Sequence, residues 1–273
     1  MKKISLSAVL IFLALTLTTA QRGWEVGGWV GVSNYFGDLN TTFDVTHPHL
    51  AGGGVFRFNF NERLCLKMAA NYGYISANDK DSRNTFELRR NLNFRTNIFE
   101  GTGQFEFNFM PYNYFDKSQW FSPYLFGGLG VFNFNPQGKL DNTWYELRRL
   151  GTEGQFPGEE YYTTQIAFVY GGGLKIALSE VWSINVEISA RKLLTDYLDD
   201  VSKTYPNMND IRKQHGDIAV SLSDPSIVVE NQPKIGQFGR QRGDSRSNDM
   251  YTMFGVSLLY YFGDLRCPPV GNR

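Results

Sequence analysis

Three features of this 273-residue sequence predict an all-β fold, an eight-stranded antiparallel transmembrane β-barrel of the outer-membrane type. Apolar and polar residues alternate with a period of two over eight stretches of about ten residues or more. Aromatic residues make up 15% of the chain and glycines number 28, which suits strands that face lipid. The chain also opens on an apolar stretch typical of an export signal.

The first 20 residues predict a cleavable signal peptide. Lys2 and Lys3 give a basic start, and residues 4–17 form an apolar core shorter than a membrane helix needs. The small residue Ala20 ends this segment, so we expect cleavage before Gln21 and export of the mature chain. The expected division is a signal peptide at 1–20, a barrel at 21–262 and a periplasmic C-terminal tail at 263–273.

The first four predicted strands span 24–36, 51–60, 63–76 and 94–109. The first ends in "YF", expected at the membrane interface, before a glycine and an aspartate that break the strand. The second contains "VFRFNF", in which phenylalanines alternate with arginine and asparagine, and the short link "NER" joins it to the third. The fourth contains "GQFEFNF", with phenylalanines on one face and polar residues on the other.

The last four predicted strands span 122–134, 164–178, 181–194 and 250–262. The dipeptide "SE" joins the second of these to the third. The third reads "VWSINVEISAR", in which apolar residues again alternate with polar ones. The last ends in "YYF", and aromatic rings of this kind are favoured where a strand leaves the bilayer.

The connections between these strands are alternately long and short. The long links fall at one end of the barrel, and the short links and both termini fall at the other. Outer-membrane barrels have this layout, with long external loops and short periplasmic turns. The long links are residues 37–50, 77–93, 135–163 and 195–249.

The polar faces of the strands carry four acids and four bases. A soluble barrel would turn these residues outward, and periodicity alone does not separate the two arrangements. An eight-stranded barrel has interior room only for side chains, and paired charges suit such a lumen, whereas an unpaired buried charge costs about 3–5 kcal/mol. We therefore expect a closed lumen with a charge network. Its expected members are Glu25, Arg57, Lys67, Glu100, Glu106, Lys175, Glu187 and Arg191.

Few residues offer catalytic or metal-binding chemistry. The three histidines, His47, His49 and His215, lie in predicted loops, and two neighbouring histidines do not complete a metal site. We therefore expect no enzyme activity and no cofactor. The 27 basic and 27 acidic residues balance, which gives no case for nucleic-acid binding. Cys65 and Cys267 are compatible with one disulfide bridge or with two free thiols.

Two groups of charged loop residues allow alternative roles. Asp196, Asp199 and Asp200 in "DYLDD" can bind calcium or form the solvated start of a loop, and we expect the second. The similar segments at 84–90 and 142–149 carry arginine pairs that either bind lipopolysaccharide phosphates or pair with loop acids. These arginines are Arg89, Arg90, Arg148 and Arg149.

Several longer segments resemble a known family, the PorG-like barrels of the DUF6089 type. The similar segments follow the family's order over nearly the whole mature chain. They are "WEVGGWVGVSNYFGDLN", "LNFRTNIFE", "SPYLFGGLGVFNFNP", "WYELRRLGTEGQ", "YGGGLKIALSEVWSINVEISARKLLTDYLDDVS" and "YYFGDLRCPP". A paralogous surface barrel of the same family is the competing assignment.

The resemblance implies a non-enzymatic outer-membrane component of the type IX secretion system. Such proteins are taken to associate with a periplasmic ring of PorK- and PorN-type proteins, while lipid and lipopolysaccharide surround the barrel. We expect the ring to contact the turn at 110–121 and the tail, whose two prolines hold it extended. The expected contact residues are Tyr112, Phe115, Arg266, Pro268 and Pro269.

Two other functional classes remain open at the level of sequence. A surface barrel for adhesion or envelope integrity would depend on its long loops rather than on its short turns. A lipid-modifying enzyme would need a histidine, or an acid and a serine, assembled near the membrane edge.

Overall fold

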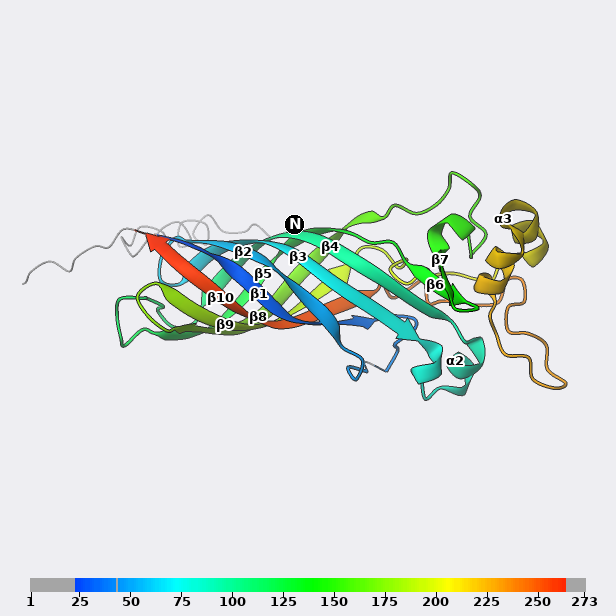
Figure 1. Cartoon of the computed structure of the whole chain (residues 1–273), viewed down its shortest axis with the longest axis horizontal. Coiled ribbons are helices and arrows are strands. Elements are labelled where there is room, and N and C mark those ends of the chain that lie inside the picture. The colour runs from blue at the N-terminus through cyan, green and yellow to red at the C-terminus, as the bar shows by residue number, and fades with distance from the viewer. Residues whose placement is uncertain (1–22, 43, 264–273) are drawn as a thin grey trace, which may run out of the picture.

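Eight long antiparallel strands close into a barrel in the computed structural model, which describes residues 23–42 and 44–263 (Figure 1). The strand order is β3-β2-β1-β10-β9-β8-β5-β4, and β3 pairs with β4 to close the ring. The predicted fold class is confirmed, and every strand begins and ends within two residues of its expected position. The strands are β1 (Gly23–Phe36), β2 (His49–Asn59), β3 (Leu64–Asn78), β4 (Asn93–Asn108), β5 (Phe121–Asn133), β8 (Thr164–Ala177), β9 (Trp182–Leu193) and β10 (Met250–Gly263).

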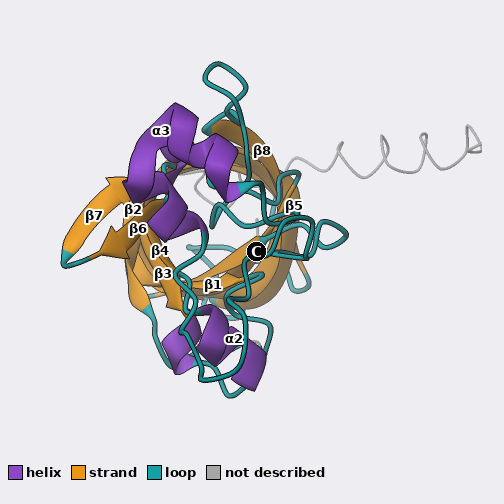
Figure 2. Ribbon diagram, turned by 90° about the vertical axis from the view of Figure 1, so that its right-hand side faces the viewer, coloured by secondary structure: helices purple, strands orange, loops and turns teal. Residues whose placement is uncertain are grey.

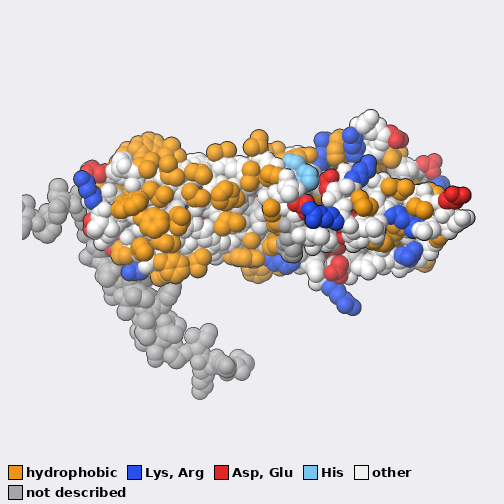
Figure 3. Space-filling model, turned by 90° about the horizontal axis from the view of Figure 1, so that it is seen from below, with side chains coloured by type: hydrophobic (Ala, Val, Ile, Leu, Met, Phe, Trp, Pro, Cys, Tyr) orange, Lys and Arg blue, Asp and Glu red, His pale blue; other side chains and the backbone are white. Residues whose placement is uncertain are grey.

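The outward residues form an apolar belt around the part of the barrel nearer the short turns. Phe99, Phe105 and Leu129 are 60%, 65% and 54% exposed. A soluble protein rarely exposes so continuous an apolar surface, so the belt indicates contact with lipid. Figure 3 shows the apolar side chains over the barrel and the charged ones gathered mainly at its two ends, most of them at the long-loop end. Further belt residues are Val30, Met68, Phe168, Ile188 and Phe254.

The long links contain secondary structure that the sequence did not predict. Two helices form there because asparagines cap their first turns: the side chains of Asn84 and Asn207 accept hydrogen bonds from Phe86 N and Asn209 N. A hairpin forms because Asp141 and its neighbour adopt the left-handed conformation that a tight turn requires. The elements are η1 (Asp79–Asp81), α2 (Thr85–Arg90), β6 (Gln137–Leu140), β7 (Thr143–Glu146), η2 (Leu147–Leu150) and α3 (Met208–Ser223). Among the described helices, none is long and apolar enough to cross a membrane.

These elements and their loops form a cap at the barrel mouth, with the β6–β7 hairpin beside the mouth (Figure 2). Leu39, Leu147 and Leu222 of the cap pack against apolar residues that line the mouth, including Phe94 and Phe132. We define the cap as the described residues of 37–48, 79–92, 134–163 and 194–249. Tyr35 and Phe36, which we expected at the membrane interface, are instead buried beside it, 3% and 7% exposed, because β1 extends beyond the belt.

The signal peptide, the tail from residue 264 and Cys267 lie outside the described residues. The described chain begins at Gly23 and ends at Gly263, which pair with each other at the short-turn end. Cys65 is buried inside the barrel, 1% exposed, and receives a contact of 3.4 Å from Nζ of Lys175.

Candidate functional site

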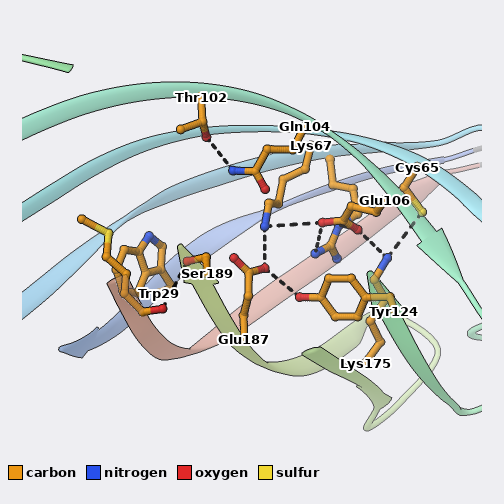
Figure 4. Close-up of polar contacts among 12 residues, drawn as sticks. Trp29, Cys65, Lys67, Thr102, Gln104, Glu106, Tyr124, Lys175, Glu187 and Ser189 are labelled. Atoms are coloured by element: carbon orange, nitrogen blue, oxygen red, sulfur yellow. Dashed lines mark hydrogen bonds and ion pairs between the residues drawn. The ribbon is translucent and has the colours of Figure 1, made fainter. Parts of the chain in front are cut away.

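Six of the eight expected lumen residues form one ion-pair network near the short-turn end. Figure 4 labels four of them, Lys67, Glu106, Lys175 and Glu187. Glu106 is its centre, with Arg57 Nε at 2.9 Å and Lys175 Nζ at 2.6 Å from Oε2. Lys67 lies 3.5 Å from the other carboxylate oxygen of Glu106 and 2.5 Å from Glu187. Three acids therefore face three bases, and the formal charges cancel.

Glu25 is the sixth member of this network near the short-turn end. Its carboxylate accepts from Arg57 Nη1 at 2.6 Å and from Asn59 Nδ2 at 2.6 Å. The two acids on either side of Arg57 both form ion pairs with its buried guanidinium. Pairing of this kind offsets the large cost of taking the charges out of water.

The other two expected residues form a second layer farther toward the long loops. Arg191 Nε lies 3.2 Å from Glu100 Oε1. The same carboxylate accepts from Asn71 Nδ2 at 2.8 Å and from the Tyr251 hydroxyl at 3.1 Å. The formal charges of this second layer also cancel.

Aromatic residues complete both layers, and sequence reasoning missed them. The Tyr124 hydroxyl donates to Glu187 at 2.7 Å, and Trp29 Nε1 donates to Asn71 at 2.8 Å. Both side chains lie on the inward face of their strands, so strand parity could have identified them. Their aromatic character made them resemble residues that face lipid.

The lumen retains little free space between the two layers. A cavity of about 30 Å³ is lined by residues that include Lys67, Glu187, Arg191 and Trp29. That volume holds about one or two water molecules. The described lumen is therefore filled by side chains and does not offer a continuous water path.

Tyrosines fill the barrel at its short-turn end. Tyr112 and Tyr114 are 6% and 7% exposed, and the Tyr114 ring stacks on Tyr261 with centroids 4.7 Å apart. The Tyr114 hydroxyl donates to Ser183 Oγ at 2.8 Å. Burial raises the pKa of both turn hydroxyls above the ordinary value, so they remain protonated. Tyr112, which we expected to contact a partner, therefore faces inward, whereas Phe115 is 37% exposed.

Two buried arginines hold the cap together. Arg90 Nη2 lies 2.8 Å from Asp79, and its terminal nitrogens donate to the carbonyls of Asp38 and Arg242. Arg242 in turn pairs with Glu153 at 3.1 Å. Arg90 therefore takes the second of its two predicted roles, pairing with a loop acid, and is not available to lipopolysaccharide.

The other three loop arginines also contact the cap. Arg89 Nη2 donates to the carbonyl of Pro233 at 2.6 Å, and Arg148 Nε donates to that of Tyr161 at 2.7 Å. Arg149 pairs with Glu146 at 3.0 Å on the surface. These contacts do not bring the four arginines together as one phosphate clamp.

The expectation that "DYLDD" begins a solvated loop is wrong. Asp196, Asp199 and Asp200 are 8%, 1% and 1% exposed because the cap folds over them. The Tyr35 hydroxyl donates to Asp199 at 2.5 Å, and the Tyr161 hydroxyl donates to Asp200 at 2.8 Å. In the described part of the chain, no three His, Cys, Asp or Glu side chains are grouped so as to hold a metal ion.

Burial changes the acidity of these cap residues. It raises the pKa of Asp196 to about 7, and the negative charge of nearby acids, Asp38 first, adds to the shift. Burial also raises the pKa of Asp200 to about 6, although Arg242 opposes it, and that of Asp38 to about 6. The cap therefore contains carboxyl groups that take up protons near neutral pH.

Each histidine contacts a hydroxyl or a backbone carbonyl. His49 Nε2 lies 2.7 Å from Ser76 Oγ, and His215 Nε2 lies 3.2 Å from the carbonyl of Gln155. His47 Nδ1 lies 3.1 Å from the Thr46 hydroxyl. Among the described residues, no carboxylate is bonded to any of the three rings.

Comparisons with known proteins add one family and several barrels. The family model described as "Domain of unknown function (DUF6089)" matches residues 3–221. No curated protein matches the sequence. The outer membrane protein OprG of Pseudomonas aeruginosa is 11% identical, with a TM-score of 0.46 over 90% of this chain and 98% of OprG.

Two further solved barrels have similar sequence identity, TM-score and coverage. Neisserial surface protein A is 9% identical, with a TM-score of 0.42 over 88% of this chain and 97% of that one. The N-terminal β-barrel domain of OprF from Pseudomonas aeruginosa is 10% identical, with a TM-score of 0.39 over 89% and 100%. The membrane assignment of this chain rests on its own apolar belt rather than on these likenesses.

Proposed function

We propose that this chain, which belongs to the DUF6089 family, is a non-enzymatic outer-membrane scaffold of the type IX secretion machinery. In this role it anchors a periplasmic ring of PorK- and PorN-type proteins through its short-turn end. The resemblance of its longer segments to PorG-like barrels supports the assignment. The description of the family names no function, and further support for the proposal comes from the interior of the barrel.

The filled lumen is the observation that carries the proposal. Two neutral layers of ion pairs leave about 30 Å³ between them, and tyrosines occupy the short-turn end. A barrel without a water path acts through its exterior and its two ends. A scaffold needs only such surfaces, whereas a channel or transporter needs the interior.

The short-turn end offers accessible side chains for docking. Phe115 is 37% exposed and Trp120 is 50% exposed, and the exposed Lys117 lies between them. Aromatic side chains are enriched where protein interfaces carry most of their binding energy. The tail residues Arg266, Pro268 and Pro269 lie outside the described residues and remain part of the proposal.

Affinity purification of the ring tests the proposal. Tagged full-length protein should recover ring proteins after mild detergent extraction, and truncation after Leu265 should reduce both this recovery and type IX export. Phe115→Ala should reduce recovery about tenfold if it is an interface anchor. Phe156→Ala is the matched control, because Phe156 is 55% exposed at the opposite end.

Membrane insertion has to be measured beside ring recovery. The truncation keeps every strand, so it should still give a heat-modifiable barrel in the outer membrane. If the truncated protein inserts and still recovers the ring, the tail is not the docking element. If the full-length protein recovers no ring, the secretion role itself is excluded.

The cap favours a second candidate, a surface barrel for adhesion. Tyr162, Val228 and Phe238 of the cap are 80%, 68% and 79% exposed. Exposed apolar groups of this kind can contact another surface. In that case substitution of these three residues by serine would reduce cell attachment and leave ring recovery and export unchanged.

The contact between His49 and Ser76 is the histidine–serine pair that the enzyme alternative would use. A catalytic dyad would also need a group to orient the imidazole, and no described carboxylate is bonded to it. We therefore expect His49→Ala and Ser76→Ala to leave the mass spectrum of lipid A unchanged. The gain or loss of an acyl chain relative to the wild type would overturn the non-enzymatic assignment.

A further inference from the structure

A polar groove lies beside the barrel where the apolar belt ends. It consists of two hollows of about 410 Å³ and 760 Å³ that share Tyr74. One wall is formed by β3 and β4, and the other by the β6–β7 hairpin and the end of α3. Figure 2 shows this hairpin beside the barrel mouth rather than across it. We call it the side groove, and its residues used below are Lys80, Asn93, Arg95, Asn97, Lys139 and Trp144.

The side groove begins directly above the belt. The belt residue Phe99 lines its lower hollow, and the Tyr72 ring lies 5.2 Å from the Phe99 ring. The Tyr72 hydroxyl donates to Asn97 at 2.8 Å, an arrangement suited to a membrane interface. Arg95 lies on the same face of β4 as Phe99, about 13 Å farther along the strand and about 10 Å higher for a tilt of roughly 40°. The groove therefore faces the headgroup layer on the long-loop side.

Arg95 is held in place with part of its guanidinium unused. The guanidinium lies 4.0 Å from the centre of the Trp144 ring, and Nε donates to Gln137 Oε1 at 3.0 Å. Its two terminal nitrogens have no acceptor within the described chain. A guanidinium fixed in this way matches a phosphate or carboxylate and loses little entropy on binding it.

Further basic side chains make the side groove positive. Lys80 and Lys139 are exposed, and neither ammonium has an ion-pair partner among residues 23–42 and 44–263. Lys234 also lines the groove, whose acids are Asp141 and Asp224. Asp224 is only 4% exposed, so the accessible charge is predominantly basic.

Amide groups lie between these bases. Asn93 Oδ1 accepts from the backbone N–H of Lys139 at 2.7 Å, which ties the hairpin to β4. Asn97 and Asn135 line the lower hollow. Amides offer both donors and acceptors, and sugar hydroxyls need both.

We propose that the side groove binds the phosphorylated sugar headgroup of a glycolipid in the leaflet on the long-loop side. Arg95 and the lysines take the phosphate, the asparagines take sugar hydroxyls, and the acyl chains lie against the belt at Phe99. A free sugar phosphate presents the same polar groups without the chains. The proposal is independent of the secretion role, because the groove lies at the opposite end from the proposed ring contact.

Native mass spectrometry of full-length protein from lipid nanodiscs tests the proposal. The nanodiscs contain phosphatidylethanolamine, phosphatidylglycerol and rough lipopolysaccharide, and glucosamine 1-phosphate is added in a separate arm. Arg95→Gln with Lys139→Gln should reduce retained lipopolysaccharide about tenfold, since each charge-assisted contact contributes strongly. The matched control is Arg212→Gln with Lys213→Gln, an exposed arginine and an exposed lysine outside the groove.

Trp144→Leu separates positioning from charge. It removes the ring that holds Arg95 while keeping every basic group, and should reduce retention about threefold. Heat modifiability of each variant shows that the barrel is folded. Equal retention by the groove pair and the control pair would overturn the proposal. Binding of glucosamine 1-phosphate as tight as that of lipopolysaccharide would overturn the assignment to a lipid.

Discussion

At the scale of single residues, the barrel interior depends on matched charges. Glu106 holds three bases around one carboxylate, and Glu187 accepts from one base and one tyrosine. Removing one partner from such a group leaves an uncompensated buried charge, which is far costlier than the loss of a surface ion pair. The lumen network is therefore where single substitutions should affect stability most.

We expect Glu106→Leu to destabilise the barrel by about 3–5 kcal/mol, because it leaves Arg57, Lys67 and Lys175 without their shared acid. Glu187→Leu should cost less, since Lys67 keeps its contact with Glu106. Urea unfolding of the reconstituted barrel, followed by tryptophan fluorescence, measures both changes.

Glu230→Leu is the control for this comparison, because Glu230 is exposed in the cap. It should change stability by less than about 0.5 kcal/mol. Equal losses for Glu106→Leu and Glu230→Leu would show that the ion-pair network does not stabilise the barrel.

The buried cap acids predict that the cap is more stable at mildly acid pH. Asp196 has a pKa of about 7 in the folded protein, above its ordinary value, so the folded state binds the proton more tightly. The resulting stability is fully present below about pH 4 and is lost as pH rises toward 7. Asp38 and Asp200 shift in the same direction.

Hydrogen exchange of residues 194–249, corrected for intrinsic rates, measures this effect. Exchange should be about tenfold faster at pH 7.5 than at pH 5.5. Asp196→Asn should reduce the difference, whereas Asp217→Asn should not, because the Asp217 side chain is 83% exposed. Faster exchange at pH 5.5 would contradict the assigned direction.

At the scale of elements, the apolar and polar faces of a long strand exchange places partway along it. On β4, Glu106 and Glu100 face inward within the belt, whereas farther on Ile98 and Phe94 face inward and Arg95 faces outward. The part of the strand nearer the short turns has its apolar face toward lipid. The part nearer the long loops has its apolar face toward the interior, as in a soluble barrel. This reversal lets the cap pack into the mouth by ordinary apolar burial.

The cap geometry predicts where trypsin cleaves on intact cells. The segment 227–234 and Arg240 are exposed, whereas Arg90 and Arg242 are buried. We expect the first cuts after Lys234 or Arg240, with Arg90 and Arg242 protected until the cap unfolds. Mass spectrometry of the released peptides identifies the sites.

Lys234→Gln with Arg240→Gln should slow this first cleavage about tenfold without changing membrane insertion. Cleavage that requires prior opening of the outer membrane would place the long loops in the periplasm. That result would reverse the proposed orientation.

At the scale of the whole molecule, the barrel is filled in layers from one end to the other. Tyrosines occupy the short-turn end, ion pairs fill the middle, and apolar residues join the mouth to the cap. Function is therefore expected at the surfaces: a docking end, an apolar belt, a cap and the side groove. The belt fixes the depth of the molecule in the membrane, and so fixes which of these surfaces meets headgroups.

We expect the reconstituted barrel to show no steady ion conductance in planar bilayers. The space between the ion-pair layers is about 30 Å³, too small for a hydrated ion path. A porin in the same lipid serves as the positive control. Stable open channels from the wild-type protein would show that the lumen opens in the membrane.

The sequence by itself determined the strands and the composition of the lumen. Period-two alternation is a local property, because each strand crosses the same two environments, so "GQFEFNF" was sufficient to divide β4 into an apolar and a polar face. The balance of charges on the polar faces and the export signal then indicated which face turns to lipid. The short links and the balance of acids and bases likewise predicted a closed barrel. The eight expected lumen residues come together because strand parity and strand pairing follow from the same alternation.

Only the tertiary structure decided how the loops are used. Long-range packing buried "DYLDD" and Arg90 under the cap, turned Tyr112 inward, and set the hairpin beside the barrel to form the side groove. Loop residues have no repeating environment, so their burial depends on partners far away in the chain. Arg90 illustrates this, since its contacts come from residues 11, 52 and 152 positions away. The sequence around a loop residue does not indicate partners so far away along the chain. The strands could therefore be predicted from local pattern, and the cap could not.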